Sequence, residues 1–214
     1  MLKIILLILN CKKYDWKRKQ QKEGWLKNLP SNISYFHVIG DEDISNDFIF
    51  DEDNRILQVR CKDDYNSLPI KVISAIDAVN KTYEFDFIYK TDDDQELIRE
   101  DFFDYIENQI IENGYKYGGH LSYVNDHYST YKKFHNELPS KLFLKKAKYS
   151  NGRFYFLNKE CINHLIKSKE RIKDHFIEDH CMGFYLGEIL EEKDYLYVNT
   201  LIYLNDIKNN DIHK

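Results

Sequence analysis

Short apolar runs alternate along the chain with longer segments in which apolar residues recur every three or four positions. The short runs are rich in β-branched and aromatic residues, which favour strands. They predict strands at 4–9, 33–39, 56–60, 85–89, 116–124, 154–157 and 195–204. The helical spacing predicts helices within 12–29, from Ser67 to Val79, and at 96–113, 159–169 and 178–190. Such alternation is typical of an α/β/α sandwich with a mainly parallel sheet, so we expect a single domain over 1–214 with a polar tail from about 205.

Two of the predicted helices carry signals at their ends. Ser67 can cap a helix that has Pro69 in its first turn, and Gly114 follows the helix at 96–113, where glycine readily ends a helix. Two stretches predict no regular element. One is the acidic segment 41–53, which holds a brief apolar piece at 48–50, and the other is the polar, tyrosine-rich segment that runs to 148.

The first apolar run imitates a secretory signal. The stretch 4–9 is shorter than the apolar region of a signal peptide, and it leads into Asn10, Cys11 and Lys12 without a small-residue cleavage site. We therefore interpret it as a buried strand. No other segment is long enough to span a bilayer, so we expect no transmembrane segment.

Composition narrows the classes of function. The 214 residues are 43% hydrophobic and 31% charged, which suits a soluble protein with one substantial core. The net charge of −5 argues against a general nucleic-acid binder, although the basic stretch 12–22 could meet a phosphorylated ligand. The four cysteines lack C-x-x-C spacing, which gives no support to a zinc or redox motif and favours a reducing compartment.

Three successive carboxylates, Asp92, Asp93 and Asp94, come two residues after the strand at 85–89. Ligands of open α/β sheets bind at the carboxyl ends of strands, and adjacent carboxylates repel one another unless a hard cation or water offsets their charge. The triplet therefore indicates a metal site. A solvated loop is the other interpretation, because the chain holds 36 Asp and Glu residues. The glycine and spaced ligands of an EF-hand are missing.

Five motifs lie in a characteristic order over most of the chain. They are R-K-Q-Q-K-E-G-W at 18–25 followed by F-H-V-I-G at 36–40, R-I-L-Q-V-R-C-K-D-D-Y-N-S-L-P-I-K at 55–71, K-T-D-D-D at 90–94, Y-S-N-G-R-F-Y-F-L at 149–157 and E-D-H-C-M-G at 178–183. This set resembles the β1,3-galactosyltransferase and Fringe-like family of GT-A glycosyltransferases, whose K-T-D-D-D motif it matches outright. The resemblance implies a Rossmann-like GT-A fold.

The chain departs from the family pattern at several positions. Ser67 replaces the family's asparagine, Ser150 its cysteine, and Arg153 and Phe154 two of three glycines. Those glycines would let the backbone approach the sugars closely, so the identity of donor and acceptor cannot be transferred from the family.

The resemblance implies a metal-dependent, inverting transfer of a hexose or N-acetylhexosamine. The donor would be a UDP-sugar, the cofactor Mn²⁺ or Mg²⁺, and the acceptor a hydroxyl of a carbohydrate or glycoconjugate, which gains a β-linkage. The implied metal ligands are Asp94, Asp92 and a C-terminal histidine, His213; the implied base is Asp179. The implied donor-binding residues are Arg18, Lys22, Asp63, Tyr65, Lys71, Lys90, Asp92, Asp93 and Glu178.

Other interpretations stay open at this point. Glu178 and Asp179 could merely complement a helix dipole, and the basic residues could be solvated surface charges. A metal-dependent nucleotidyl or phosphoryl transferase, or a catalytically silent module that binds a nucleotide or glycan, would fit the same acidic motifs. Family members are often anchored in the Golgi, whereas this chain starts at its first strand. We therefore expect a cytoplasmic enzyme of a bacterium or virus-infected host, or a soluble chain trimmed of its anchor, of unknown oligomeric state.

Overall fold

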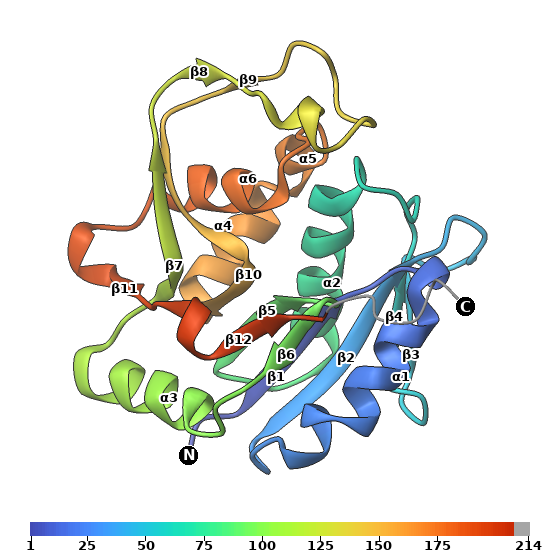
Figure 1. Ribbon diagram of the computed structural model, residues 1–214, viewed down its shortest axis with the longest axis vertical. Helices are drawn as coiled ribbons and strands as arrows, with labels where there is room; N and C mark the ends of the chain where they lie inside the picture. Colours follow the sequence, from blue (N-terminus) through green and yellow to red (C-terminus); the bar gives the residue numbers. More distant parts are fainter. Residues whose placement is uncertain (208–214) are drawn as a thin grey trace.

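An eight-stranded sheet runs through the molecule in the order β11-β7-β10-β5-β1-β2-β4-β3 (Figure 1). The computed structural model of the protein describes residues 1–207. In chain order the strands of the sheet are β1 (Ile4–Leu9), β2 (Ile33–Gly40), β3 (Phe48–Asp51), β4 (Ile56–Val59), β5 (Phe87–Asp92), β7 (Tyr117–Val124), β10 (Ala147–Asn158) and β11 (Tyr195–Tyr197). Six of the eight run in one direction, while β3 and β10 run in the other.

Strand β1 lies at the centre of the fold because all six of its residues are apolar and buried. Side chains of successive strand residues point to opposite faces of a sheet. Ile5, Leu7 and Leu9 accordingly enter one hydrophobic cluster, while the remaining residues of β1 enter the other. A strand that is apolar on both faces requires cover on both, which is the pattern of a parallel sheet between two layers.

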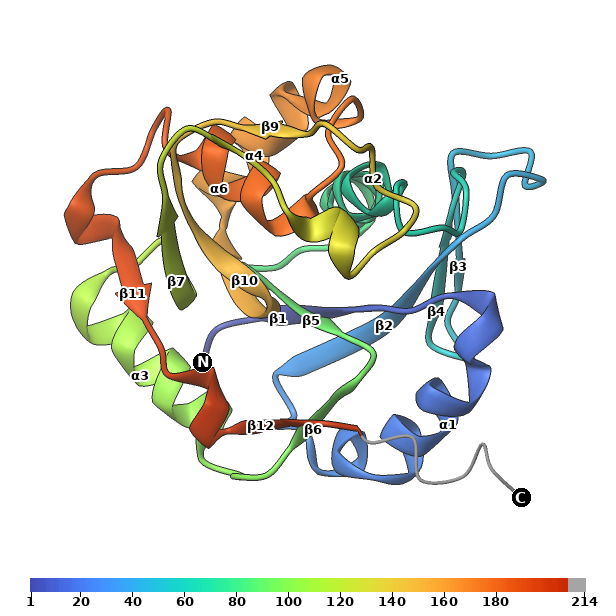
Figure 2. The same cartoon turned by 45° about the horizontal axis from the view of Figure 1, so that its top comes forward.

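Two layers cover the sheet (Figure 2). One face packs against four helices: α2 (Leu68–Thr82), α4 (Lys159–Lys167), α5 (Lys169–Ile172) and α6 (Glu178–Leu186). The other face is covered by α1 (Asp15–Glu23), α3 (Phe102–Asn113), the short 3-10 helix at Trp25–Asn28, and the two-stranded sheet of β6 (Gln95–Leu97) and β12 (Leu204–Asp206). The expected mixed α/β sandwich with a mostly parallel central sheet is confirmed.

The helix expected at 96–113 begins only at Phe102, so its predicted start was wrong. Residues 95–97 instead form β6, which pairs antiparallel with β12. Ile98, which lies within the predicted range, is outside the helix and is 47% exposed. Gly114 ends the helix as expected, in the left-handed conformation at φ 72°.

Other bounds also differ from the expectation. The strand expected at 154–157 is the end of the longer β10, whose pairing with β7 shifts register between Ser150 and Tyr155. The strand expected at 195–204 splits into β11 and β12 around a 3-10 turn, and the piece at 48–50 forms β3. Asn205 and Asp206, expected in a polar tail, belong to β12. No helix within residues 1–207 has both the length and the apolar character needed to cross a membrane.

Candidate active site

Several polar side chains meet where β1 and β5 end. The carboxyl end of β5 presents Asp92, Asp93 and Asp94, and Asn10 follows β1 on the neighbouring strand. The register shift of β10 and the first turn of α6 lie beside them, because Gly152 contacts both Lys90 of β5 and Asp179 of α6. The site is therefore assembled at the edge of the sheet where α/β proteins bind ligands.

The middle residue of the triplet, Asp93, is a structural residue. Its Oδ2 accepts a hydrogen bond from Asn10 Nδ2 at 2.8 Å, and its Oδ1 pairs with Lys17 Nζ at 2.8 Å. Its residue surface is 8% exposed. Asp93 thus ties β5 to the end of β1 and to α1, and its role in contacting the donor stays a prediction.

The outer residues, Asp92 and Asp94, keep oxygens open. Asp92 Oδ1 pairs with Lys90 Nζ at 2.7 Å, and Asp94 Oδ1 accepts from Gln95 Nε2 at 2.7 Å. Neither Oδ2 has a hydrogen-bonding partner within residues 1–207. The Asp92 side chain is 39% exposed. The Asp94 carboxylate lies near enough to Asp92 to contribute to the raised pKa of Asp92, so the two carboxylates can act on one ligand.

The buried cation of the site is Lys90. Its Nζ lies 2.7 Å from Asp92 Oδ1, 3.2 Å from Glu178 Oε2 and 2.8 Å from the carbonyl oxygen of Gly152, and the residue is 2% exposed. Burial alone would lower the pKa of Lys90, but the surrounding carboxylates outweigh it and raise that pKa. We name Asp92, Asp94, Glu178 and Asp179 the acidic cluster; Lys90 is the cation at its centre.

Gly152 connects the carboxylates at the end of β5 with Asp179 at the start of α6. Its N–H donates to Asp179 Oδ2 at 3.1 Å, and its carbonyl oxygen accepts from Lys90. A Cβ at this position would lie 2.9 Å from Asp92 Oδ2 and 3.2 Å from Lys90 Nζ. Glycine is required here because any side chain would push against the Asp92 carboxylate.

Asp179 sits in the first turn of α6, where a carboxylate is favoured by the helix dipole. Its Oδ1 accepts from the backbone N–H of His180 at 2.7 Å and its Oδ2 from Gly152. Burial raises the pKa of Asp179 and the Asp92 carboxylate adds to this, against the opposing effect of Lys90. Burial also raises the pKa of Asp92, to about 6. The cluster therefore holds more negative charge than Lys90 offsets.

Glu178 is a buried carboxylate of the acidic cluster, held in place by protein groups on both of its oxygens. It is 7% exposed, and the Tyr155 hydroxyl donates to its Oε1 at 2.5 Å while Lys90 pairs with its Oε2. Both oxygens are occupied by protein groups, so the structure gives Glu178 a positioning role. Its predicted contact with the donor stays a prediction.

Asp63 and Lys71 form an ion pair next to Asn10, at the end of β1. Lys71 is 2% exposed, and its Nζ lies 2.6 Å from Asp63 Oδ1 and 3.1 Å from the carbonyl oxygen of Asn10. Asp63 also accepts from the backbone N–H groups of Gly40 and Lys12. The pair thus fixes the ends of β1 and β2. Because Lys71 is buried, the alternative interpretation of a solvated surface charge is wrong for this residue, and its predicted role in donor binding stays a prediction.

Arg18 and Lys22 are not brought to the triplet. Arg18 pairs with Asp15 of its own helix, and Lys22 donates to the carbonyl oxygen of Asn54, in the turn at the amino end of β4. Lys17, one position earlier on α1, is the residue that reaches the triplet. The predicted roles of Arg18 and Lys22 in donor binding stay predictions.

Tyr65 does lie beside the acidic cluster. Burial, with the nearby carboxylates of Asp179 and Asp92, raises the pKa of the Tyr65 hydroxyl to about 12. Its ring stacks on His135 with centroids 4.0 Å apart. An aromatic face next to two carboxylates is suited to a sugar or a base, which presents both a flat face and polar groups.

A second network holds Asp94. Arg153 donates to Gln95 Oε1 at 2.7 Å and pairs with Asp206 Oδ1 at 2.8 Å, while the backbone N–H of Ile207 donates to the Asp94 carbonyl oxygen. The pairing of β6 with β12 therefore brings the end of the described chain to the acidic cluster. His213, the expected third metal ligand, lies outside the described residues.

The oxygen ligands at this site suit a hard divalent cation that takes only a few of its ligands from the protein. Within residues 1–207, no three His, Cys, Asp or Glu side chains are grouped so that they alone could hold a metal ion. Asp92 and Asp94 offer two carboxylate oxygens that have no partner among residues 1–207. Mg²⁺ is usually held by one or two carboxylates together with water and substrate phosphates, and such a set matches this arrangement.

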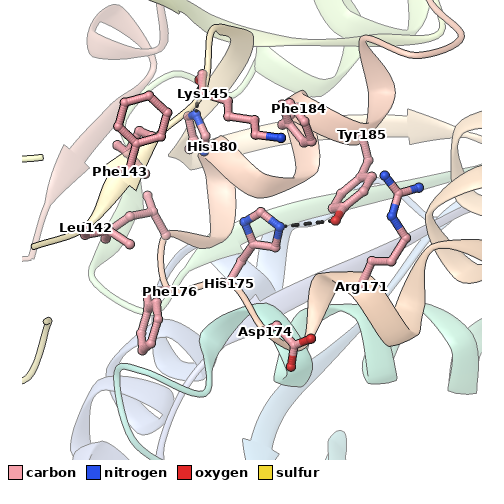
Figure 3. A pocket seen from close by; sticks show the side chains of 12 residues that line it. Leu142, Phe143, Lys145, Arg171, Asp174, His175, Phe176, His180, Phe184 and Tyr185 are labelled. Carbon is pink, nitrogen blue, oxygen red and sulfur yellow. Dashed lines mark hydrogen bonds between the residues drawn. The ribbon is translucent and has the colours of Figure 1, made fainter. Parts of the chain in front are cut away.

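A cavity of about 480 Å³ lies between α6, the residues that precede α6 and the segment 142–145 (Figure 3). Gly183 of α6 packs on Tyr149 of β10, where a Cβ would come within 2.2 Å. His175 Nε2 lies 3.1 Å from the Tyr185 hydroxyl, and His180 Nε2 donates to the Lys145 carbonyl oxygen. The cavity is lined by Leu142, Phe143, Leu144, Lys145, Arg171, Asp174, His175, Phe176, Ile177, His180, Phe184 and Tyr185. Neither the triplet nor Asp179 lines it.

Sequence reasoning missed the residues that support the acidic cluster. Lys17, Asn10 and Tyr155 all contact cluster or triplet side chains from other elements. Gly152 belongs to the motif at 149–157. A single glycine among larger residues of a strand was the one signal in the sequence that the backbone there approaches another group closely.

Comparisons with known proteins identify the family and the fold of the chain. The sequence model of the galactosyltransferase family matches residues 13–190. No curated protein sequence matches the chain. A solved glycosyltransferase involved in the glycosylation of the major capsid of PBCV-1 is 10% identical, with a TM-score of 0.52 over 92% of this chain and 81% of that one. This similarity supports the GT-A sandwich.

Two further solved structures are more distant. The galactosyltransferase LgtC in complex with donor and acceptor sugar analogues is 11% identical, with a TM-score of 0.48 over 92% of this chain and 73% of that one. Mouse xyloside xylosyltransferase 1 in its apo form is 12% identical, with a TM-score of 0.41 over 92% and 85%. The family match over most of the chain confirms the resemblance expected from the motifs: the chain belongs to the galactosyltransferase family of glycosyltransferases.

Proposed function

We propose that the protein is a metal-dependent inverting glycosyltransferase. It would move a hexose or N-acetylhexosamine from a UDP-sugar to a hydroxyl of a carbohydrate acceptor and form a β-linkage. The observation that carries this proposal is the arrangement of Asp92, Asp94 and Asp179. In the described part of the chain, the first two each keep an oxygen without a hydrogen-bonding partner. Gly152 lies between Asp92 and Asp179: its N–H donates to Asp179, and its lack of a side chain leaves room for the Asp92 carboxylate.

Asp92 and Asp94 would hold Mn²⁺ or Mg²⁺. When bound, such an ion neutralises the diphosphate of the departing UDP as a Lewis acid. Within residues 1–207, Lys71 and Lys90 offer little positive charge for this purpose, since both are engaged with carboxylates of the protein. His213 is proposed as a further ligand of the metal ion. The backbone N–H of Ile207 donates to the Asp94 carbonyl oxygen, so Ile207 is next to the site. His213 is six residues further on, and six residues span at most about 20 Å, so His213 is within reach of Asp94.

Asp179 would act as the general base. Each of its oxygens accepts one backbone hydrogen bond, and a carboxylate oxygen has a second lone pair for an acceptor hydroxyl. The raised pKa makes it a stronger base. As the hydroxyl oxygen bonds to the anomeric carbon, its proton passes to Asp179. The bond from that carbon to the UDP oxygen breaks with its electron pair, and an α-linked donor yields a β-linked product.

The remaining residues would shape the donor site. Tyr65 presents its ring beside the reacting groups, while Asp63 and Lys71 fix the strand ends that receive the nucleotide. Asp93, Glu178 and Lys90 set the positions of the neighbouring carboxylates. Arg18 and Lys22 would contribute only by leaving their present partners on binding.

Release of UDP from UDP-galactose, UDP-N-acetylglucosamine and UDP-glucose, each with and without Mn²⁺, tests this proposal. We expect Mn²⁺-dependent release from one of them, reduced by orders of magnitude in Asp179→Asn while binding of UDP persists. Turnover of nucleoside triphosphates instead would favour a nucleotidyl or phosphoryl transferase. UDP binding without release of sugar, with any acceptor, would favour a silent binding module.

A further inference from the structure

The segment 123–148 is a second basic stretch of the chain beside 12–22, and we name it the basic lobe. It contains six lysines, one Asp and one Glu in a chain whose net charge is −5. Lys148 pairs with Glu192, but Lys132, Lys133, Lys141, Lys145 and Lys146 form no ion pair with a carboxylate of residues 1–207. Their charge is therefore available to an external anionic partner.

Exposed aromatic rings are interleaved with these lysines. Phe134 is 77% exposed and Tyr128 is 67% exposed, and Tyr123, Tyr131 and Phe143 are also exposed. In the pair of β8 (His127–Tyr128) and β9 (Phe143–Leu144), Tyr128 lies opposite Phe143 with ring centroids 5.3 Å apart. Leu144, whose side chain points the other way, is buried. The hairpin thus turns its aromatic face to solvent.

The basic lobe is fixed to the body of the protein beside the acidic cluster. His135 stacks on Tyr65, and Asn66 Nδ2 donates to the carbonyl oxygen of Glu137 at 3.0 Å. Leu138 and Leu144 pack with Ile177, directly before α6. Figures 1 and 2 show the loop between β8 and β9 extending past α6 from the ends of β7 and β10. A surface that binds the lobe would therefore face the catalytic end of the sheet.

We propose that the basic lobe docks on the surface of a lipid bilayer that contains anionic lipids. Lysines near such a surface are attracted to its negative potential, and exposed aromatic rings enter the boundary between headgroups and acyl chains. Both features occur together here. A nucleic acid or a polyanionic glycan also pairs with lysines and stacks on aromatic rings, but the net charge of −5 argues against a nucleic acid, and the test below separates a glycan from a bilayer. Docking would present membrane-borne molecules to the acidic cluster, and it stands independently of the proposed reaction.

Sedimentation of the full chain with phospholipid vesicles tests the proposal. We expect binding to vesicles of phosphatidylcholine with about 30% phosphatidylglycerol, weak binding to pure phosphatidylcholine, and loss of binding at high salt. The charge variant is Lys145→Glu with Lys146→Glu. Each reversal should weaken binding by about fivefold or more. A second variant, Tyr128→Ser with Phe143→Ser, removes the aromatic face and should also weaken binding.

A matched control is Lys3→Glu with Lys27→Glu, which makes the same change of net charge. Both lysines are exposed, and they precede β1 and β2 at the opposite end of the sheet. We expect this variant to bind vesicles nearly as well as the unaltered chain, with circular dichroism confirming that all variants are folded. Absence of binding to anionic vesicles, equal losses in the two charge variants, or retention on heparin without vesicle binding would overturn the proposal.

Discussion

Replacing Lys90 by Met removes the cation at the centre of the acidic cluster while keeping most of the side-chain volume. Lys90 Nζ lies 2.7 Å from Asp92 and 3.2 Å from Glu178, and both Lys90 and Glu178 are almost fully buried. Removing one partner of a buried ion pair leaves an uncompensated charge, which typically costs about 3–5 kcal/mol. We expect Lys90→Met to lower the free energy of unfolding by an amount in this range.

The loss should depend on pH with a definite sign. Burial already raises the pKa of Glu178 and Asp179, and Lys90 opposes that rise. Without Lys90 the folded-state pKa values rise further above those of the unfolded chain, so the folded state binds more protons. Stability then falls as pH rises through the raised values. The destabilisation should therefore be smaller at pH 5 than at pH 8.

Urea denaturation at both pH values measures these quantities. Glu178→Gln, combined with Lys90→Met, should cost less than the sum of the two single changes, because the amide needs no counter-charge. Lys173→Met is the control, since its pairing with Glu170 is at the surface and should contribute little to stability. A loss for Lys90→Met below about 1 kcal/mol, equal at both pH values, would refute the reasoning.

Three further changes test parts of the site. Gly152→Ala should lower kcat at least about tenfold without unfolding the protein, because its Cβ would displace the Asp92 carboxylate; normal turnover would argue against that packing. Arg153→Met should raise the Kd for Mn²⁺ in a calorimetric titration, since it releases Gln95 and Asp206 beside Asp94, and an unchanged Kd would contradict this role. Removal of divalent metal with EDTA should abolish UDP release and Mn²⁺ should restore it; turnover that persists in EDTA would exclude metal dependence.

Much of the fold could be predicted because local pattern determines it. The apolar run of β1 and the helical spacing of α2 reflect burial of the same residues in the structure. Strand β6 could not be predicted, because its partner β12 lies more than 100 residues later. Glu96 and Ile98 therefore matched a helical pattern that the distant pairing overrides.

Part of the acidic cluster could be predicted because its residues belong to local sequence motifs. Asp92, Asp94 and Asp179 stand out as motifs, and their mutual position follows from the ends of β5 and α6. The difference between Asp93 and its neighbours does not appear in the sequence, because it depends on Asn10 and Lys17. The burial of Lys71 is likewise set by Asp63 and the strand ends around it.

The central claim is that a divalent cation at Asp92 and Asp94 binds the diphosphate while Asp179 serves the acceptor. Calorimetric titration of UDP into the protein, with Mn²⁺ and with EDTA, tests it most directly. The account predicts that UDP binds tightly only with Mn²⁺, that Asp94→Asn loses this binding, and that Asp179→Asn keeps it. Equal affinity for UDP with Mn²⁺ and with EDTA, or an unchanged affinity in Asp94→Asn, would contradict the account.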